Sequence, residues 1–275
     1  MVDDPLGVEI RDGHIGYHRA GDGPAIVLLH GYVGDGLGTW GRQLETLSDG
    51  FTVVAWDAPG FGSSFDPPES FTLADYADSL AAFIERVGLE RPHVVGMSFG
   101  GGLAIELYRR HPHVPRSLVL ASAYAGWTGS LPPEVVEFRL NQALKLADLP
   151  PEQLVKAIVP TLFSPAAPKA LVDRFAASML EFHPAGLRAT ARSFANADLR
   201  GVLPQIDVPT LLVYGSEDER APLDVAENMH AAIRGSSLVV LDGVGHVVNV
   251  EASERFDAAL RPFLRGSLEG SPAGA

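Results

Sequence analysis

The sequence contains no cysteine, so disulfide bonds and thiolate metal sites are excluded. It also has no run close to the roughly 18 consecutive apolar residues that a membrane-spanning helix needs. Residues 1–5 are acidic and lack the apolar segment of a secretory signal peptide. We therefore expect a cytoplasmic protein that does not bind membranes.

Basic residues are few, because 21 Lys and Arg stand against 34 Asp and Glu, which gives a net charge of −13. This excess of negative charge argues against nucleic acid and anionic lipid as partners. The chain has no glycine-rich loop of the P-loop type. Nine histidines are present, but His111 and His113 flank a proline at a predicted helix end without the carboxylates of a metal site. We expect no cofactor, no metal and a small-molecule substrate, and the sequence leaves a homo-oligomer open.

The most informative segment is Gly96-Met97-Ser98-Phe99-Gly100, which follows an apolar run and opens a helix-like segment. This G-x-S-x-G pattern is typical of a nucleophile elbow, a sharp strand-to-helix turn that exposes a serine hydroxyl. The two outer glycines leave room for the turn. Ser98 is therefore the predicted nucleophile.

An acid and a base follow in the order that such a serine needs. Asp218 lies in a loop directly after the apolar run 210–214, and His246 lies in a glycine-rich loop after the run 238–241. A histidine takes the proton of the serine hydroxyl, and the carboxylate holds the imidazole in the required tautomer. Glu217 and Glu219 flank Asp218 and are the rival acids.

Two backbone amides are the predicted oxyanion donors. One is the N–H of Phe99, the residue after the nucleophile. The other is the N–H of Tyr32, which follows the apolar run 25–29 and a His-Gly turn. We expect His30 in that turn to fix the loop by hydrogen bonding rather than to act in catalysis.

Strand and helix patterns alternate along most of the chain, which predicts an α/β protein with a mainly parallel sheet covered on both faces. An opening hairpin is expected around Asp12-Gly13. The alternation stops between Trp127 and Leu203, where four helical segments are separated by prolines. We expect a core of residues 1–126 and 204–265, a helical cap of residues 127–203 and a disordered tail of residues 266–275.

The motifs together resemble the α/β-hydrolase superfamily, and the match covers nearly the whole chain. They are His30-Gly31, the turn of residues 57–64, the segment 96–102, Gly215-x-x-Asp218-x-x-x-Pro222 and Gly245-His246. The resemblance implies an α/β-hydrolase fold with an eight-stranded sheet and a helical cap inserted after the sixth strand. Within the superfamily the chain is similar to 3-oxoadipate enol-lactonases, perhydrolases and C–C bond hydrolases.

The resemblance implies a serine hydrolase that cleaves a small carboxylic ester or lactone. Ser98 replaces the aspartate that haloalkane dehalogenases and epoxide hydrolases carry at the elbow, so acyl chemistry is expected instead. Trp127 and His183 in the cap region are candidate substrate-pocket residues, although a packing role and a surface helix end also fit them. Cleavage of a C–C bond in a vinylogous diketone, a tailoring role in biosynthesis and a small-molecule sensor are the alternatives.

Overall fold

The computed structural model describes residues 5–269, and these form an eight-stranded sheet with helices on both faces. In space the strands run in the order β1-β2-β4-β3-β5-β6-β7-β8. The strands are β1 (Leu6–Ile10), β2 (Gly13–Ala20), β3 (Ala25–Leu29), β4 (Thr52–Trp56), β5 (His93–Met97), β6 (Ser117–Ala121), β7 (Thr210–Gly215) and β8 (Ser237–Leu241).

The sheet is parallel from β4 to β8, whereas β2 pairs antiparallel with both β1 and β4. The hairpin that the sequence predicts around Asp12-Gly13 is confirmed, with Ile10 opposite Gly13. The central strands are buried along their whole length because helices cover both of their faces, and this explains their continuous apolar sequences. Parallel strands end at a common edge, and this edge carries the loops that follow β3, β5, β6, β7 and β8.

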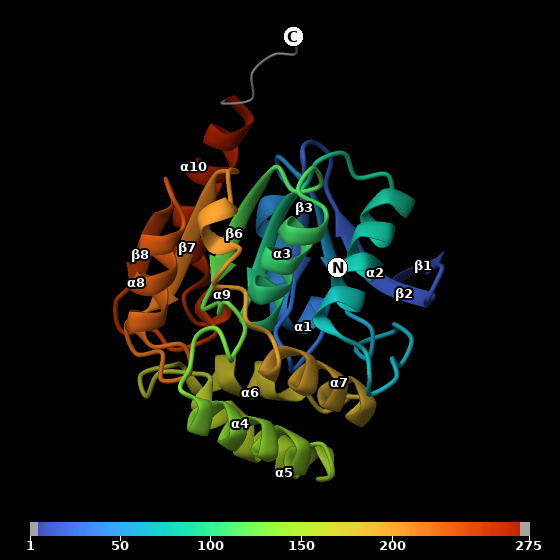
Figure 1. Cartoon of the computed structure of the whole chain (residues 1–275), viewed down its shortest axis with the longest axis vertical. Coiled ribbons are helices and arrows are strands. Elements are labelled where there is room, and N and C mark those ends of the chain that lie inside the picture. Colours follow the sequence, from blue (N-terminus) through green and yellow to red (C-terminus); the bar gives the residue numbers. More distant parts are fainter. Residues whose placement is uncertain (1–4, 270–275) are drawn as a thin grey trace.

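The helices form two layers over the sheet and a separate group beyond its carboxyl edge (Figure 1). The α-helices are α1 (Gly36–Leu47), α2 (Leu73–Arg86), α3 (Phe99–Arg110), α4 (Pro133–Leu146), α5 (Pro151–Ile158), α6 (Lys169–Ser178), α7 (Pro184–Ala195), α8 (Leu223–Ala232), α9 (Val248–Glu251) and α10 (Ser253–Glu269). Short 3-10 helices, η1 (Val159–Thr161) and η2 (Leu203–Gln205), complete the list. Helices α2, α3 and α8 cover one face of the sheet, and α1 and α10 cover the other.

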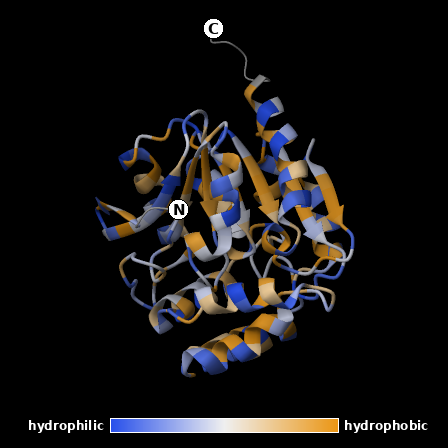
Figure 2. Ribbon diagram, turned by 180° about the vertical axis from the view of Figure 1, so that it is seen from behind, coloured by the Kyte–Doolittle hydropathy of each residue, from blue (hydrophilic) through white to orange (hydrophobic). Residues whose placement is uncertain are grey.

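Hydrophobic residues concentrate in the central strands and on the inner sides of these helices (Figure 2). Helix α2 shows how the sequence sets one such element. The Thr72 hydroxyl accepts from the N–H of Asp75, and the Asp75 carboxylate accepts from the N–H of Thr72, so a capping box fixes the start of the helix. Leu73, Tyr76 and Leu80 then bury its apolar side.

Four helices, α4 to α7, lie between β6 and β7 and form the cap that the resemblance implies. Helix α7 contacts α2, α3 and α4, so it joins the outer cap helices to the core. The cap faces the edge where the parallel strands end (Figure 1). The bounds 127–203 remain a prediction.

The predicted disordered tail of residues 266–275 is wrong for its first part, because α10 continues to Glu269. Phe256, Leu260, Leu264 and Leu268 recur at helical spacing and pack against the core, and this periodicity outweighs the small residues around Gly266. Residues 270–275 lie outside the described residues, as do residues 1–4. Within residues 5–269, no helix has the length and apolar character to cross a membrane.

Candidate active site

Ser98 occupies a strained turn between β5 and α3. Its backbone has φ 54° and ψ −112°, a conformation that non-glycine residues rarely adopt. A Cβ atom at Gly96 would lie only 2.2 Å from the carbonyl oxygen of Gly100, so this crossing of strand and helix requires glycine. The N–H of Ser98 donates to the carbonyl of Ala121 on β6 at 2.8 Å, which anchors the turn to the sheet. The local geometry is that of a nucleophile elbow.

Asp218 and His246 form a buried pair. Nδ1 of His246 donates to the Asp218 carboxylate, at 2.8 Å from Oδ2 and 3.0 Å from Oδ1. Both residues are nearly inaccessible, at 4% and 2% exposure. The neighbouring Glu217 and Glu219 are exposed, so the structure pairs His246 with Asp218 and not with the rival acids.

The environment of Asp218 keeps its carboxyl group ionised. Burial acts to raise the pKa of Asp218, but the charge of His246 and several hydrogen bonds outweigh it and lower that pKa. Two of these bonds come from the backbone, since Oδ1 accepts from the N–H of Arg220 at 2.9 Å and of Ala221 at 2.8 Å. A carboxylate surrounded by these donors can orient His246 and stabilise its protonated form.

The cap holds the backbone of His246 in place. The carbonyl of Leu162 accepts from the N–H of His246 at 2.8 Å and of Val247 at 3.2 Å. A carboxylate strengthens this junction, because Glu251 accepts from the N–H of Gly245 and the N–H of Ser164, each at 3.1 Å, and from the Ser164 hydroxyl. The loop that carries His246 is therefore tied to the segment that follows η1.

Ser98, Asp218 and His246 follow β5, β7 and β8, so all three lie at the common edge where these parallel strands end. Within residues 5–269, the hydrogen bonds join His246 to Asp218 but do not join Ser98 to His246. In enzymes without substrate the bond between nucleophile and base is often long. The structure thus brings the acid and the base into contact and places the serine on the same edge.

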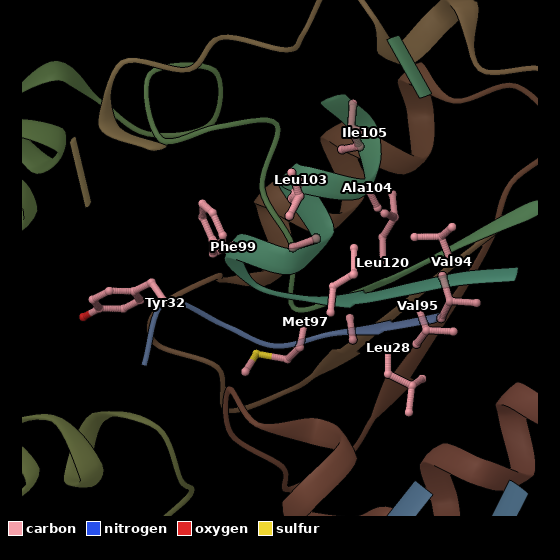
Figure 3. Packing of buried hydrophobic residues seen from close by; sticks show 14 of the residues in the cluster. Leu28, Tyr32, Val94, Val95, Met97, Phe99, Leu103, Ala104, Ile105 and Leu120 are labelled. Carbon is pink, nitrogen blue, oxygen red and sulfur yellow. The ribbon is translucent and has the colours of Figure 1, made fainter. Parts of the chain in front are cut away.

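The loop after β3 packs against the elbow. A Cβ atom at Gly31 would lie 3.8 Å from the Cβ of Ser98, and one at Gly100 would lie 2.6 Å from the carbonyl oxygen of His30. Tyr32 and Phe99 accordingly lie at the same end of the buried core (Figure 3). Within the described part of the chain, the backbone N–H groups of Tyr32 and Phe99 have no hydrogen-bond acceptor. These two amides are available to an oxyanion.

His30 has the structural role that the sequence analysis expects. Nδ1 donates to the carbonyl of Gly31 at 2.6 Å, and Nε2 accepts from the N–H of Ala58 at 3.0 Å. Burial lowers the pKa of His30 despite the opposing charge of Asp57, so the ring stays neutral. Because both ring nitrogens are engaged, His30 is not free to transfer protons and instead fixes the loop that presents Tyr32.

A cavity of about 430 Å³ lies under the cap beside this edge. Tyr32 and Trp127 line it, and their rings meet edge to face with centroids 6.1 Å apart. A role of Trp127 in substrate binding stays a prediction. His183 is elsewhere, because its Nδ1 pairs with Asp66 at 2.7 Å and it does not line this cavity. The structure therefore does not bring His183 to the site.

Two arginines at the cavity were missed by the sequence analysis. Arg139 projects from α4, and Arg220 lies in the loop after β7, two residues beyond Asp218. Arg139 donates to the Tyr124 hydroxyl at 3.0 Å and to the carbonyl of Arg220 at 2.8 Å. Arg220 donates to the Tyr32 hydroxyl at 3.1 Å. Only the proximity of Arg220 to Asp218 could have indicated this location from the sequence.

Within residues 5–269, no three His, Asp or Glu side chains are arranged to hold a metal ion. His111 is instead paired with Asp78 at 2.8 Å. The arrangement around Ser98 needs no metal for acyl transfer, because a serine, a histidine and a carboxylate supply nucleophile, base and orientation.

Comparison with known proteins identifies the architecture. Residues 24–253 match the family model described as alpha/beta hydrolase fold. A pimeloyl-[acyl-carrier protein] methyl ester esterase of Neisseria meningitidis serogroup B is 31% identical over 264 residues, which cover 88% of this chain and 93% of that protein.

Solved structures agree with this match. A thermophilic esterase from Thermogutta terrifontis, with malate bound, is 27% identical and has a TM-score of 0.87, covering 96% of this chain and 99% of its own. An enol-lactonase from Burkholderia xenovorans LB400 has a TM-score of 0.86 at 24% identity, covering 94% of this chain and all of its own, and it shows a common fold.

Proposed function

The chain belongs to the alpha/beta hydrolase fold family and is a hydrolase, and on this premise we propose that it cleaves a small carboxylic ester or lactone through an acyl-enzyme on Ser98. The observation that carries the proposal is the buried Asp218–His246 pair at the same sheet edge as the strained Ser98. The esterase names of two similar proteins support ester chemistry for this chain as well.

In the first half of the proposed reaction, Ser98 Oγ attacks the carbonyl carbon while Nε2 of His246 takes the hydroxyl proton. Asp218 stabilises the resulting imidazolium through the Nδ1 hydrogen bond. The negative charge that develops on the carbonyl oxygen is stabilised by the N–H groups of Tyr32 and Phe99. Collapse of the tetrahedral intermediate then expels the alcohol, which leaves with the proton from His246.

Water completes the cycle. His246 removes a proton from a water molecule, the hydroxide attacks the acyl carbon, and Ser98 leaves with the proton returned by His246. In a lactone the alcohol and the acid are parts of one molecule, so ring opening needs the same groups. The cavity of about 430 Å³ beside Tyr32 and Trp127 adjoins the proposed oxyanion loop, and its size suits part of a small molecule.

The test is hydrolysis of 4-nitrophenyl acetate, butyrate and octanoate and of an enol-lactone by the wild-type protein and Ser98→Ala. We expect the substitution to lower turnover by at least about 10⁴-fold, as for loss of other serine nucleophiles. Ser193→Ala is the control, because the Ser193 hydroxyl in α7 donates only to the carbonyl of Thr190.

A fluorophosphonate reagent gives a second readout, because it should add covalently to Ser98, as located by peptide mass spectrometry. Wild-type rates in Ser98→Ala on every substrate that the protein turns over would refute the proposed nucleophile. A protein inert to all four substrates and to the reagent would exclude ester and lactone hydrolysis of this kind.

A further inference from the structure

The guanidinium groups of Arg139 and Arg220 lie half-buried at the cavity under the cap. All their hydrogen-bond acceptors are neutral. Arg139 uses the Tyr124 hydroxyl and the carbonyl of Arg220, and Arg220 uses the Tyr32 hydroxyl and the Thr161 hydroxyl, the last at 2.9 Å. Two cations therefore share one cavity and hold only polar partners without charge.

Within residues 5–269, no carboxylate oxygen lies within 4.0 Å of either guanidinium. Glu219 also lines the cavity, but it is exposed and forms no ion pair with them. Asp218 is close in sequence to Arg220, yet its oxygens are used by His246 and by backbone N–H groups. Partly buried charges are normally paired, so the two arginines lack the anion that their setting favours.

The arginines of the neighbouring cap helix α7 show the contrast. Arg188 pairs with Asp148 at 2.8 Å and with Glu69 at 3.5 Å, and Arg192 pairs with Glu69 at 3.5 Å. Both arginines therefore have carboxylate partners, and neither lines this cavity. The absence of carboxylate partners is thus a feature of the cavity and not of the cap as a whole.

Arg220 also lies close to the predicted oxyanion loop. Its guanidinium carbon is 5.5 Å from the centroid of the Tyr32 ring, and the N–H of Tyr32 is one of the two proposed oxyanion donors. A ligand group bound to Arg220 would therefore lie about the length of one tyrosine side chain from the reacting carbonyl. The planar fork of a guanidinium fits a carboxylate through two parallel hydrogen bonds.

We propose that the substrate carries a carboxylate in addition to its scissile ester or lactone group, and that Arg220 and Arg139 bind this carboxylate. This inference rests on the proposed function for the position of the reacting carbonyl. It adds a substrate class, namely small monoanionic esters or lactones. Local positive charge in the cavity offsets the net charge of −13, which by itself would repel such substrates.

The first experiment compares 4-nitrophenyl monoesters of glutaric and adipic acid with their methyl esters, which match them in length but carry no charge. We expect the wild-type protein to prefer the monoanions in kcat/KM. Arg220→Gln and Arg139→Gln should each reduce this preference by about 10- to 100-fold, the range expected for loss of one charged hydrogen-bond partner. The change should lie mainly in KM, and it should be larger for the monoanions than for the methyl esters.

Two further variants separate charge from packing. Arg220→Lys keeps the positive charge and should restore part of the preference, whereas a packing role would not distinguish Lys from Gln. Arg188→Gln is the matched control on the cap surface and should leave the preference unchanged. Equal kcat/KM for charged and neutral esters in the wild-type protein would overturn the inference while leaving ester hydrolysis intact.

Binding gives a readout that does not depend on turnover. Calorimetric titration of Ser98→Ala with adipic acid monomethyl ester and with the dimethyl ester should show binding of the monoanion only. The Arg139→Gln, Arg220→Gln double variant on the same background should lose it. If no ester is hydrolysed, the proposed function fails, and this titration still decides the inference. Monoanion binding that persists in the double variant would overturn it.

Discussion

Gly100 is the position where one methyl group should damage catalysis most directly. In Gly100→Ala the new Cβ would lie 2.4 Å from the carbonyl oxygen of Leu29 and 2.6 Å from that of His30. Ordinary contacts begin at 3.4 Å, so the start of α3 and the end of β3 would have to separate by about 1 Å. Both neighbours are backbone atoms, and no side chain can turn away to relieve the contact.

This separation acts on the predicted oxyanion site, because Phe99 begins α3 and Tyr32 follows β3. A misplacement of about 1 Å costs on the order of 10²-fold in rate, and loss of one oxyanion donor costs about 10²–10³-fold. We therefore expect kcat/KM to fall by about 10²-fold or more, which corresponds to at least about 2.7 kcal/mol of transition-state stabilisation. Strain of the core should also cost about 1–3 kcal/mol of folding free energy.

The assay is Ser98-dependent ester hydrolysis together with thermal unfolding. Gly201→Ala is the matched control, since nothing lies within 4 Å of a Cβ at that glycine and it should change neither quantity. Circular dichroism would verify that Gly100→Ala is folded at the assay temperature. A folded Gly100→Ala protein with kcat/KM within threefold of wild type would refute the reasoning about the elbow and the oxyanion loop.

Two other predictions concern polar groups, the half-buried Glu251 and the fully buried His93. Glu251→Ala removes the acceptor for Gly245 and Ser164, where each charged hydrogen bond is worth about 1.5–3 kcal/mol, so thermal unfolding should occur at lower temperature and kcat should fall. Glu251→Gln should recover part of both, and an alanine variant as stable as wild type would contradict this role. Burial lowers the pKa of His93 to about 4, so the folded protein binds this proton less readily than the unfolded chain, whose histidines titrate near about 6.5. The contribution of the neutral His93 to the free energy of unfolding is complete above about pH 6.5 and falls by up to about 3 kcal/mol as the pH drops to about 4. His93→Asn should reduce the pH dependence of the free energy of urea unfolding in this range. An unchanged pH dependence in the variant would contradict this prediction.

Much of the fold could be predicted because buried parallel strands have a distinct sequence. The runs 25–29 and 210–214 are apolar and end at turn residues, and the structure has strands there. The start of helix α1 is harder to locate from the sequence, because the helical spacing of its large apolar residues begins only at Trp40, whereas the helix begins at Gly36. Glycines at positions 36 and 38 obscure the first turn, although the Asp35 carboxylate caps it by accepting from the N–H of Gly38 at 2.6 Å.

The candidate site also contains residues that the sequence predicts and residues that it does not. Ser98 and His246 lie in short motifs whose residues are adjacent in the chain, so the sequence alone points to them. The cavity-lining Arg139 and Arg220 are 81 residues apart, and only the packing of the cap on the core brings them together. A sequence pattern cannot distinguish such arginines from solvated ones, because the distinction depends on which long-range partners they lack.

The hydrogen bond from the N–H of His246 to the carbonyl of Leu162 links the cap to the proposed base. A cap that lifted as one rigid lid would break this bond and release the loop of His246 at the same moment. Substrate entry by such a motion would therefore move His246 away from its catalytic position, and closure of the cap would return it. The rate at which this amide hydrogen exchanges with solvent deuterium would then report how often the cap opens. We expect this exchange rate to fall when a ligand fills the cavity.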